Sequence, residues 1–81
     1  MGHRVKQILE DTFTGIQVDL ADLPGQRITG SVVWEGFTGH DHVERQQQVR
    51  KALQAALGSE VQQVGILLTY TPNEYEQMMA A

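Results

Sequence analysis

The clearest excess of positive charge in this sequence lies in residues 42–58. Arg45, Arg50 and Lys51 stand there against a single acid, Glu44, whereas the whole chain of 81 residues carries a formal net charge of −4. Three cations on one helix face could contact phosphates, which dominate the affinity of proteins for nucleic acids. So few cations in an acidic chain predict at most weak nucleic-acid binding, and the favoured interpretation is a solvated helix face.

The segment Gly36-Phe37-Thr38-Gly39 has the GxxG pattern with which KH domains hold a nucleic-acid backbone. A working GxxG loop lies between two helices, whereas this segment follows a predicted strand. The favoured interpretation is therefore structural. Gly36 and Gly39 are expected to provide positive φ angles, and Phe37 is expected to cap the core.

Side chains suited to metal binding or catalysis are few. His40, Asp41 and His42 are adjacent, but two histidines at i and i+2 do not share a helix face, so we expect this segment to cap a helix. Ser31 and Ser59 have no evident histidine and acid partners. The absence of cysteine excludes disulfides, thiol catalysis and cysteine-ligated clusters built by this chain alone. We expect a protein that is not an enzyme and that has no cofactor or metal of its own.

The elements that position these residues follow from apolar periodicity. The pattern predicts a helix at 3–13, strands at about 16–20 and 28–35, a helix from about 41 to 57, a strand at 61–70 and a helix at 72–79. A turn at Pro24-Gly25 makes the first two strands antiparallel, and a right-handed crossover makes the second and third parallel. The expected fold is α+β, a two-layer sandwich of order αββαβα with a three-stranded mixed sheet and helices on one face, in a single domain of residues 1–81.

Apolar positions also predict which faces are buried. Both sides of the last strand are apolar, which favours a central place in the sheet. Thr71 and Glu74 form a capping box that begins the last helix. The long helix is expected to bury Val43, Val49, Leu53, Ala56 and Leu57, and the last strand to place Val64, Ile66, Leu68 and Tyr70 on one side and Leu67 on the other.

Apolar runs are too short for a membrane span, which needs about 20 residues. The basic residues near the amino end are followed by Glu10 and Asp11 rather than by the apolar region of a secretory signal. We therefore expect a cytoplasmic protein with no membrane partner.

Three segments at characteristic spacing resemble the BolA family, over roughly residues 28–76. The segments are Val32-Val33-Trp34-Glu35-Gly36-Phe37-Thr38-Gly39, Val43-Glu44-Arg45 with Val49, Leu53 and Leu57, and Thr69-Tyr70-Thr71-Pro72-Asn73-Glu74-Tyr75. The resemblance implies a class II KH-like fold and roles in stress response, cell shape and iron-sulfur homeostasis. It also implies DNA-binding transcriptional regulation and pairing with monothiol glutaredoxins around a bridging [2Fe-2S] cluster.

The sequence departs from the family at its histidines. Arg45-Gln46-Gln47 stands where the family has Arg-His-Arg, and Gln62-Gln63 stands where the family has a histidine that can ligate the shared cluster. Glutamine is not a usual cluster ligand, so no cofactor-binding residue is expected in this chain. Gln46, Gln47, Gln62 and Gln63 become candidate residues of a partner interface.

Three functions remain open from the sequence. The leading hypothesis is a small non-catalytic BolA-like regulator that acts through a protein partner, a monothiol glutaredoxin by resemblance, in redox and iron-sulfur homeostasis. The first alternative is a KH-like nucleic-acid-binding transcriptional regulator, and the second is a plain interaction module that uses Gln46, Gln47 and Gln48. The oligomeric state is not predicted.

Overall fold

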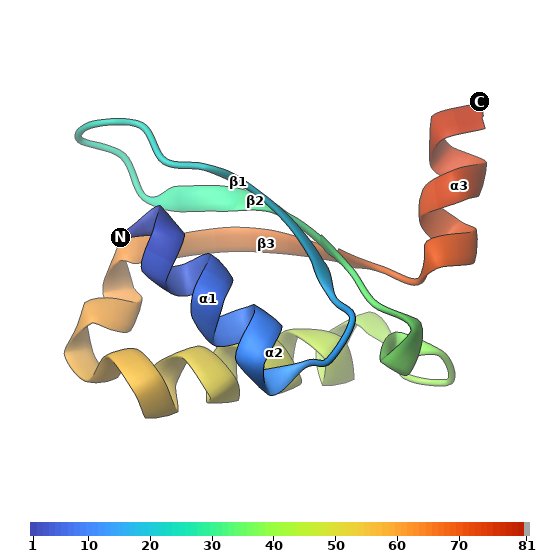
Figure 1. Cartoon of the computed structure of the whole chain (residues 1–81), viewed down its shortest axis with the longest axis horizontal. Coiled ribbons are helices and arrows are strands. Elements are labelled where there is room, and N and C mark those ends of the chain that lie inside the picture. Colours follow the sequence, from blue (N-terminus) through green and yellow to red (C-terminus); the bar gives the residue numbers. More distant parts are fainter. Residues whose placement is uncertain (81) are drawn as a thin grey trace.

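A three-stranded sheet covered on one face by two helices forms the body of the molecule (Figure 1). The computed structural model describes residues 1–80. Its elements are α1 (Gly2–Thr12), β1 (Gln17–Ala21), β2 (Ile28–Val33), the 3-10 helix η1 (Glu35–Phe37), α2 (His42–Leu57), the 3-10 helix η2 (Gly58–Gln63), β3 (Val64–Tyr70) and α3 (Pro72–Ala80). The predicted α+β class and the order αββαβα are confirmed. Within residues 1–80, no helix is both long and apolar enough to cross a bilayer.

The sheet is mixed, as predicted, and its strand order is β1-β2-β3. β1 runs antiparallel to β2 after a turn in which Gly25 has a φ of 75°, and β3 runs parallel to β2. β3 is therefore an edge strand, and its predicted central position is wrong. The apolar side chains on its second side do not face another layer, since Ile66 is 71% exposed and Leu68 50%.

An irregularity at the start of β3 changes which residues face the core. Ile28 pairs with Val64, but Gly30 pairs with Leu67, so β3 contains one residue more than β2 over this stretch. An additional residue reverses the alternation of side chains, and both Val64 and Leu67 are consequently buried. The predicted strand also began too early, because residues 61–63 belong to η2.

The core lies between the sheet and the two helices that cover it. α1 contributes Val5 and Leu9, and the buried stripe of α2 has a spacing of four residues. That stripe consists of Arg45, Val49, Leu53 and Leu57. Val43 lies two residues from Arg45, about 200° around the helix, and is 65% exposed, so its predicted burial is wrong. Ala56 is exposed too.

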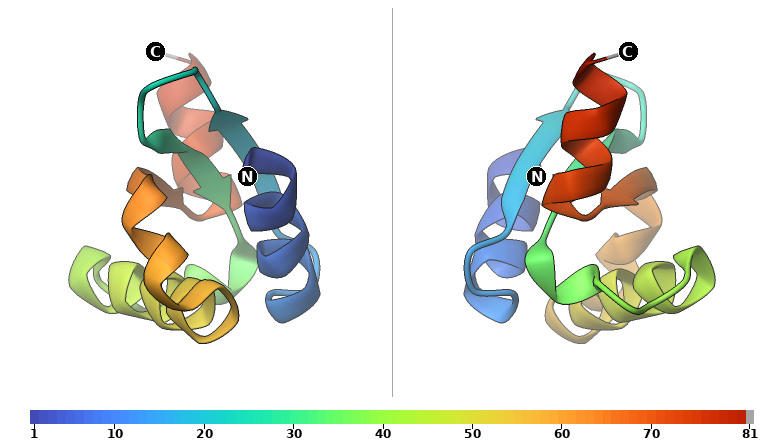
Figure 2. Two further views of the ribbon diagram at one scale, coloured as in Figure 1. Left: turned by 90° about the vertical axis from the view of Figure 1, so that its left-hand side faces the viewer. Right: turned by 90° about the vertical axis from the view of Figure 1, so that its right-hand side faces the viewer.

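α3 does not join the helix layer, which corrects the expectation that all helices share one face. It rises from the end of β3 on the side of the sheet opposite α1 and α2 (Figures 1 and 2). None of its residues, 72–80, is fully buried. One face of the sheet consequently lacks a helix layer.

Candidate functional site

The start of α2 is held by a capping box that places its polar side chains. The Glu44 backbone N–H donates to Asp41 Oδ1 at 2.8 Å, and the Asp41 N–H donates to Glu44 Oε1 at 3.1 Å. The expected capping role of the segment around Asp41 is confirmed. Within residues 1–80, no three histidine, aspartate or glutamate side chains lie close enough together to hold a metal ion.

Arg45 is a buried connection between α2 and α3. Its side chain is 6% exposed. Its Nε donates to the His40 carbonyl at 2.8 Å, and its Nη1 and Nη2 donate to the two carboxylate oxygens of Glu74 at 2.7 and 3.1 Å. The bonds from Arg45 to Glu74, together with one from the Thr71 N–H, lower the pKa of Glu74 from 4.5 to about 2. The guanidinium is buried and bonded within the protein through all three of its nitrogens, so it is not placed to contact phosphates, and the expected solvated position of Arg45 is wrong.

The three cations expected on one face are not brought together. Arg50 lies on the side of α2 that faces β3, whereas Lys51 lines a separate hollow with Thr12 of α1. Consecutive residues of a helix point about 100° apart, which explains the separation. With Arg45 buried, no continuous basic face forms on α2.

Gly36 and Gly39 of the GxxG segment are required for two different structural reasons. Gly39 has a φ of 85°, as expected, but Gly36 does not have a positive φ. A Cβ at Gly36 would overlap with the indole ring of Trp34, so a side chain there would force the ring to shift. Phe37 is fully buried, and its ring centroid lies 5.2 Å from that of Trp34. The segment follows β2, and its contacts are those of core packing.

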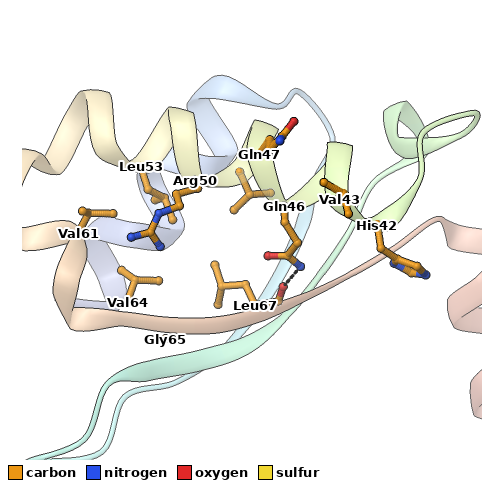
Figure 3. Close-up of a pocket in the computed structure, with 11 residues that line it drawn as sticks. His42, Val43, Gln46, Gln47, Arg50, Leu53, Val61, Val64, Gly65 and Leu67 are labelled. Carbon is orange, nitrogen blue, oxygen red and sulfur yellow. Dashed lines mark hydrogen bonds between the residues drawn. The ribbon is translucent and has the colours of Figure 1, made fainter.

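A groove lies between α2 and β3. Its volume is about 360 Å³. Its floor is apolar, and amide and guanidinium groups lie along its rim (Figure 3). We call this surface the α2–β3 groove; it is lined by His42, Val43, Gln46, Gln47, Val49, Arg50, Leu53, Val61, Val64, Gly65 and Leu67.

The edge position of β3 explains the groove. Because no further strand follows β3, its outward backbone groups need other partners. Gln46 supplies one, since its Nε2 donates to the Leu67 carbonyl across the groove at 2.7 Å (Figure 3). Arg50 reaches from α2 toward Val61 and Val64 and makes no ion pair among the described residues. Within residues 1–80, the groove thus combines an apolar floor with the unpaired guanidinium of Arg50 at its rim.

The predicted interface residues divide into two sets. Gln46 and Gln47 line the α2–β3 groove, whereas Gln62 and Gln63 are exposed on η2 between two lining residues, Val61 and Val64. Sequence reasoning missed Val61 as a lining residue because it assigned residue 61 to a strand. It also missed the pair of Arg45 and Glu74, because each residue has a local role and 29 positions separate them.

The chemistry of the groove suits recognition rather than bond making. Its lining has no carboxylate pair and no nucleophile beside a base. What it offers is apolar surface, two amide side chains and a guanidinium. Such a set binds an apolar group and selects for polar or anionic atoms next to it.

Comparison with known proteins gives a consistent result at the level of structure. No model of a known protein family and no curated protein matches the sequence. A solved bolA protein homologue from Coxiella burnetii is similar with a TM-score of 0.74 and 29% identity, over 94% of this chain and 96% of that one. The BolA domain of SufE1 from Arabidopsis thaliana is similar with a TM-score of 0.73 and 21% identity, over 90% and 93% of the two chains. A bol-like protein from Babesia bovis has a TM-score of 0.73 and 21% identity, over 98% and 93%.

Proposed function

We propose that this chain, which is BolA-like as its sequence motifs predicted, acts without catalysis by binding a protein partner in the α2–β3 groove. The observation that carries the proposal is the open apolar groove with Arg50 free of ion pairs at its rim, among the described residues. The similarity to a BolA domain of another protein supports a role as an interaction module.

The proposed partner is a monothiol glutaredoxin, by resemblance to the family, and the proposed setting is iron-sulfur and redox homeostasis or stress response in the cytoplasm. By the resemblance, Gln46-Gln47 and Gln62-Gln63 stand where the family has basic or ligating side chains. The proposed complex therefore forms through the groove without a cluster ligand from this chain. Nucleic-acid binding comes second, because the three cations expected to support it lie apart.

Titration calorimetry with a purified monothiol glutaredoxin from the same organism tests this proposal. We expect a one-to-one complex that is weakened about tenfold or more by Arg50→Glu or Val43→Asp, because both changes place an acid at the groove. Leu23→Asp is the matched control, since Leu23 is 54% exposed and lies outside the groove. Absence of a complex, or equal weakening by the control, contradicts the proposal.

A parallel titration with labelled duplex and single-stranded DNA tests the alternative function, nucleic-acid binding. We expect affinity no better than roughly 10⁻⁴ to 10⁻⁶ M at physiological salt, the range of non-specific contacts. Tight, sequence-dependent binding that persists at moderate salt would favour the nucleic-acid regulator instead.

A further inference from the structure

The outer face of the sheet, on the side opposite α1 and α2, is uncovered and apolar along β3. Leu68 pairs with Ser31 of β2, and Ser31 pairs with Asp19 of β1, so these three side chains form one row across the sheet. Ile66 lies one pleat further along β3 on the same side. Exposed fractions of 71% for Ile66 and 50% for Leu68 leave two large aliphatic side chains in water. Contiguous exposed apolar surface is a feature of interaction sites.

The chain's own α3 is held away from this face. The bonds from Arg45 to Glu74 and the capping box at Thr71 fix the direction of its first turn. Tyr75 then covers only the end of the face, next to Val33, where its ring lies 5.8 Å from that of Tyr70. α3 therefore lies at one end of the outer face and leaves the rest of that face uncovered (Figures 1 and 2).

The charge around this face selects the kind of partner. Hollows over the outer face and beside α3 are lined by Asp19, Glu35 and Glu76, and their lining contains no lysine or arginine. A second copy of this chain would bring the same acids against them. A partner with one apolar face and basic flanks complements both the aliphatic side chains of β3 and the acidic side chains near them.

The dimensions of the outer face indicate the shape of the partner. β3 has seven residues, which extend for about 23 Å, and three strands are roughly 10 to 15 Å wide. An α-helix is about 10 Å across, and about 15 residues of it match that length. A helix laid on the outer face would complete a third layer over the sheet.

We propose that the outer face of the sheet, with Ile66 and Leu68 along its β3 edge and α3 at its end, docks an amphipathic helix with basic flanks from a partner protein. This surface is separate from the α2–β3 groove, so the inference does not depend on the function proposed above.

A defined peptide tests the inference. The probe is a fluorescein-labelled peptide of about 15 leucine, alanine and lysine residues, with the leucines on one helix face, titrated with the full chain and followed by anisotropy. Its counterparts replace every lysine with glutamate, or keep the composition and scatter the leucines. We expect binding of the first peptide only. Ile66→Thr with Leu68→Thr should weaken it about tenfold or more, and Asp19→Asn should weaken it about threefold.

Matched controls distinguish specific binding at the outer face from non-specific hydrophobic binding and from the effects of misfolding. Val43→Thr and Leu23→Thr remove aliphatic side chains elsewhere that are 65% and 54% exposed, comparable with Ile66 and Leu68, and should leave the affinity unchanged. Circular dichroism melts should be the same for all variants, because each altered side chain is exposed. Absence of peptide binding, equal binding of the glutamate peptide, or equal weakening by the controls overturns the inference. Light scattering that shows a dimer of the free chain, dissolved by Leu68→Thr, also overturns it and assigns the face to a second copy.

Discussion

Arg45 of α2 and Glu74 of α3, which are 29 residues apart in the sequence, form a two-point ion pair. The guanidinium nitrogens lie 2.7 and 3.1 Å from the two carboxylate oxygens, and the Arg45 side chain is almost completely buried. The same carboxylate accepts the Thr71 N–H at 2.9 Å and so completes the cap of α3. The Glu74 carboxylate thereby connects the end of β3 and the start of α3 with the start of α2.

Replacing Arg45 should destabilise the protein. Arg45→Met removes the bonds to Glu74 and to the His40 carbonyl, and we expect a loss of about 2 kcal/mol in the free energy of unfolding. Arg4→Met is the matched control, because the pair of Arg4 and Glu60 is exposed and spans 3.5 Å. Urea unfolding measures both variants. Equal urea midpoints for the two variants would show that the buried pair stabilises the protein no more than the exposed pair does.

Acid should weaken the connection between α2 and α3 through Glu74. Its pKa is lowered from 4.5 to about 2, chiefly by the bond from Arg45, so the folded state binds the proton less readily than the unfolded chain. The resulting stabilisation is present above about pH 4.5 and is lost as the pH falls toward 2. We expect the urea midpoint of the wild type to fall more steeply over this window than that of Glu74→Gln. Glu76→Gln, on the same helix, should instead follow the wild type.

Gly36 should tolerate no side chain, because the indole of Trp34 occupies the space. Gly36→Ala is expected to cost about 1 to 3 kcal/mol and to shift the fluorescence of Trp34, the one tryptophan of the chain. Gly25→Ala provides a contrast, since it places alanine at a φ of 75° in open space. It should destabilise without changing the emission. An unshifted spectrum in Gly36→Ala would contradict the prediction, because it would show that the methyl group fits without displacing the indole ring.

Mixing the chain with a monothiol glutaredoxin under anaerobic cluster reconstitution should give no mixed cluster with a histidine-type visible spectrum. The reason is that, by the resemblance, Gln62-Gln63 stands where the family has its ligating histidine, and that the chain has no cysteine. Gln63→His should be the change that creates such a spectrum. Gln54→His, which adds a histidine on the exposed side of α2, controls for the added imidazole. A histidine-type spectrum from the unaltered chain would refute the prediction.

Local chemistry determined the parts of the structure that the sequence alone predicts. The caps at Asp41 and Thr71 each join residues three positions apart, and the burial of Val49, Leu53 and Leu57 follows from helical spacing. Such interactions form within one or two turns, so the residues that make them are visible together in the sequence. The order of elements and the mixed sheet followed from the same short-range signals and from the handedness of crossovers.

Only the tertiary structure decided what lies beside β3 and where the cations point. A central strand and an edge strand with an apolar outer face have the same pattern, so the exposure of Ile66 could not be foreseen. The additional residue in β3 moved Leu67 to the same face as Val64, a change of register that depends on pairing with β2. Arg45 appeared to be a surface cation until the fold brought Glu74 to it, because a contact between residues so far apart depends on the path of the whole chain between them.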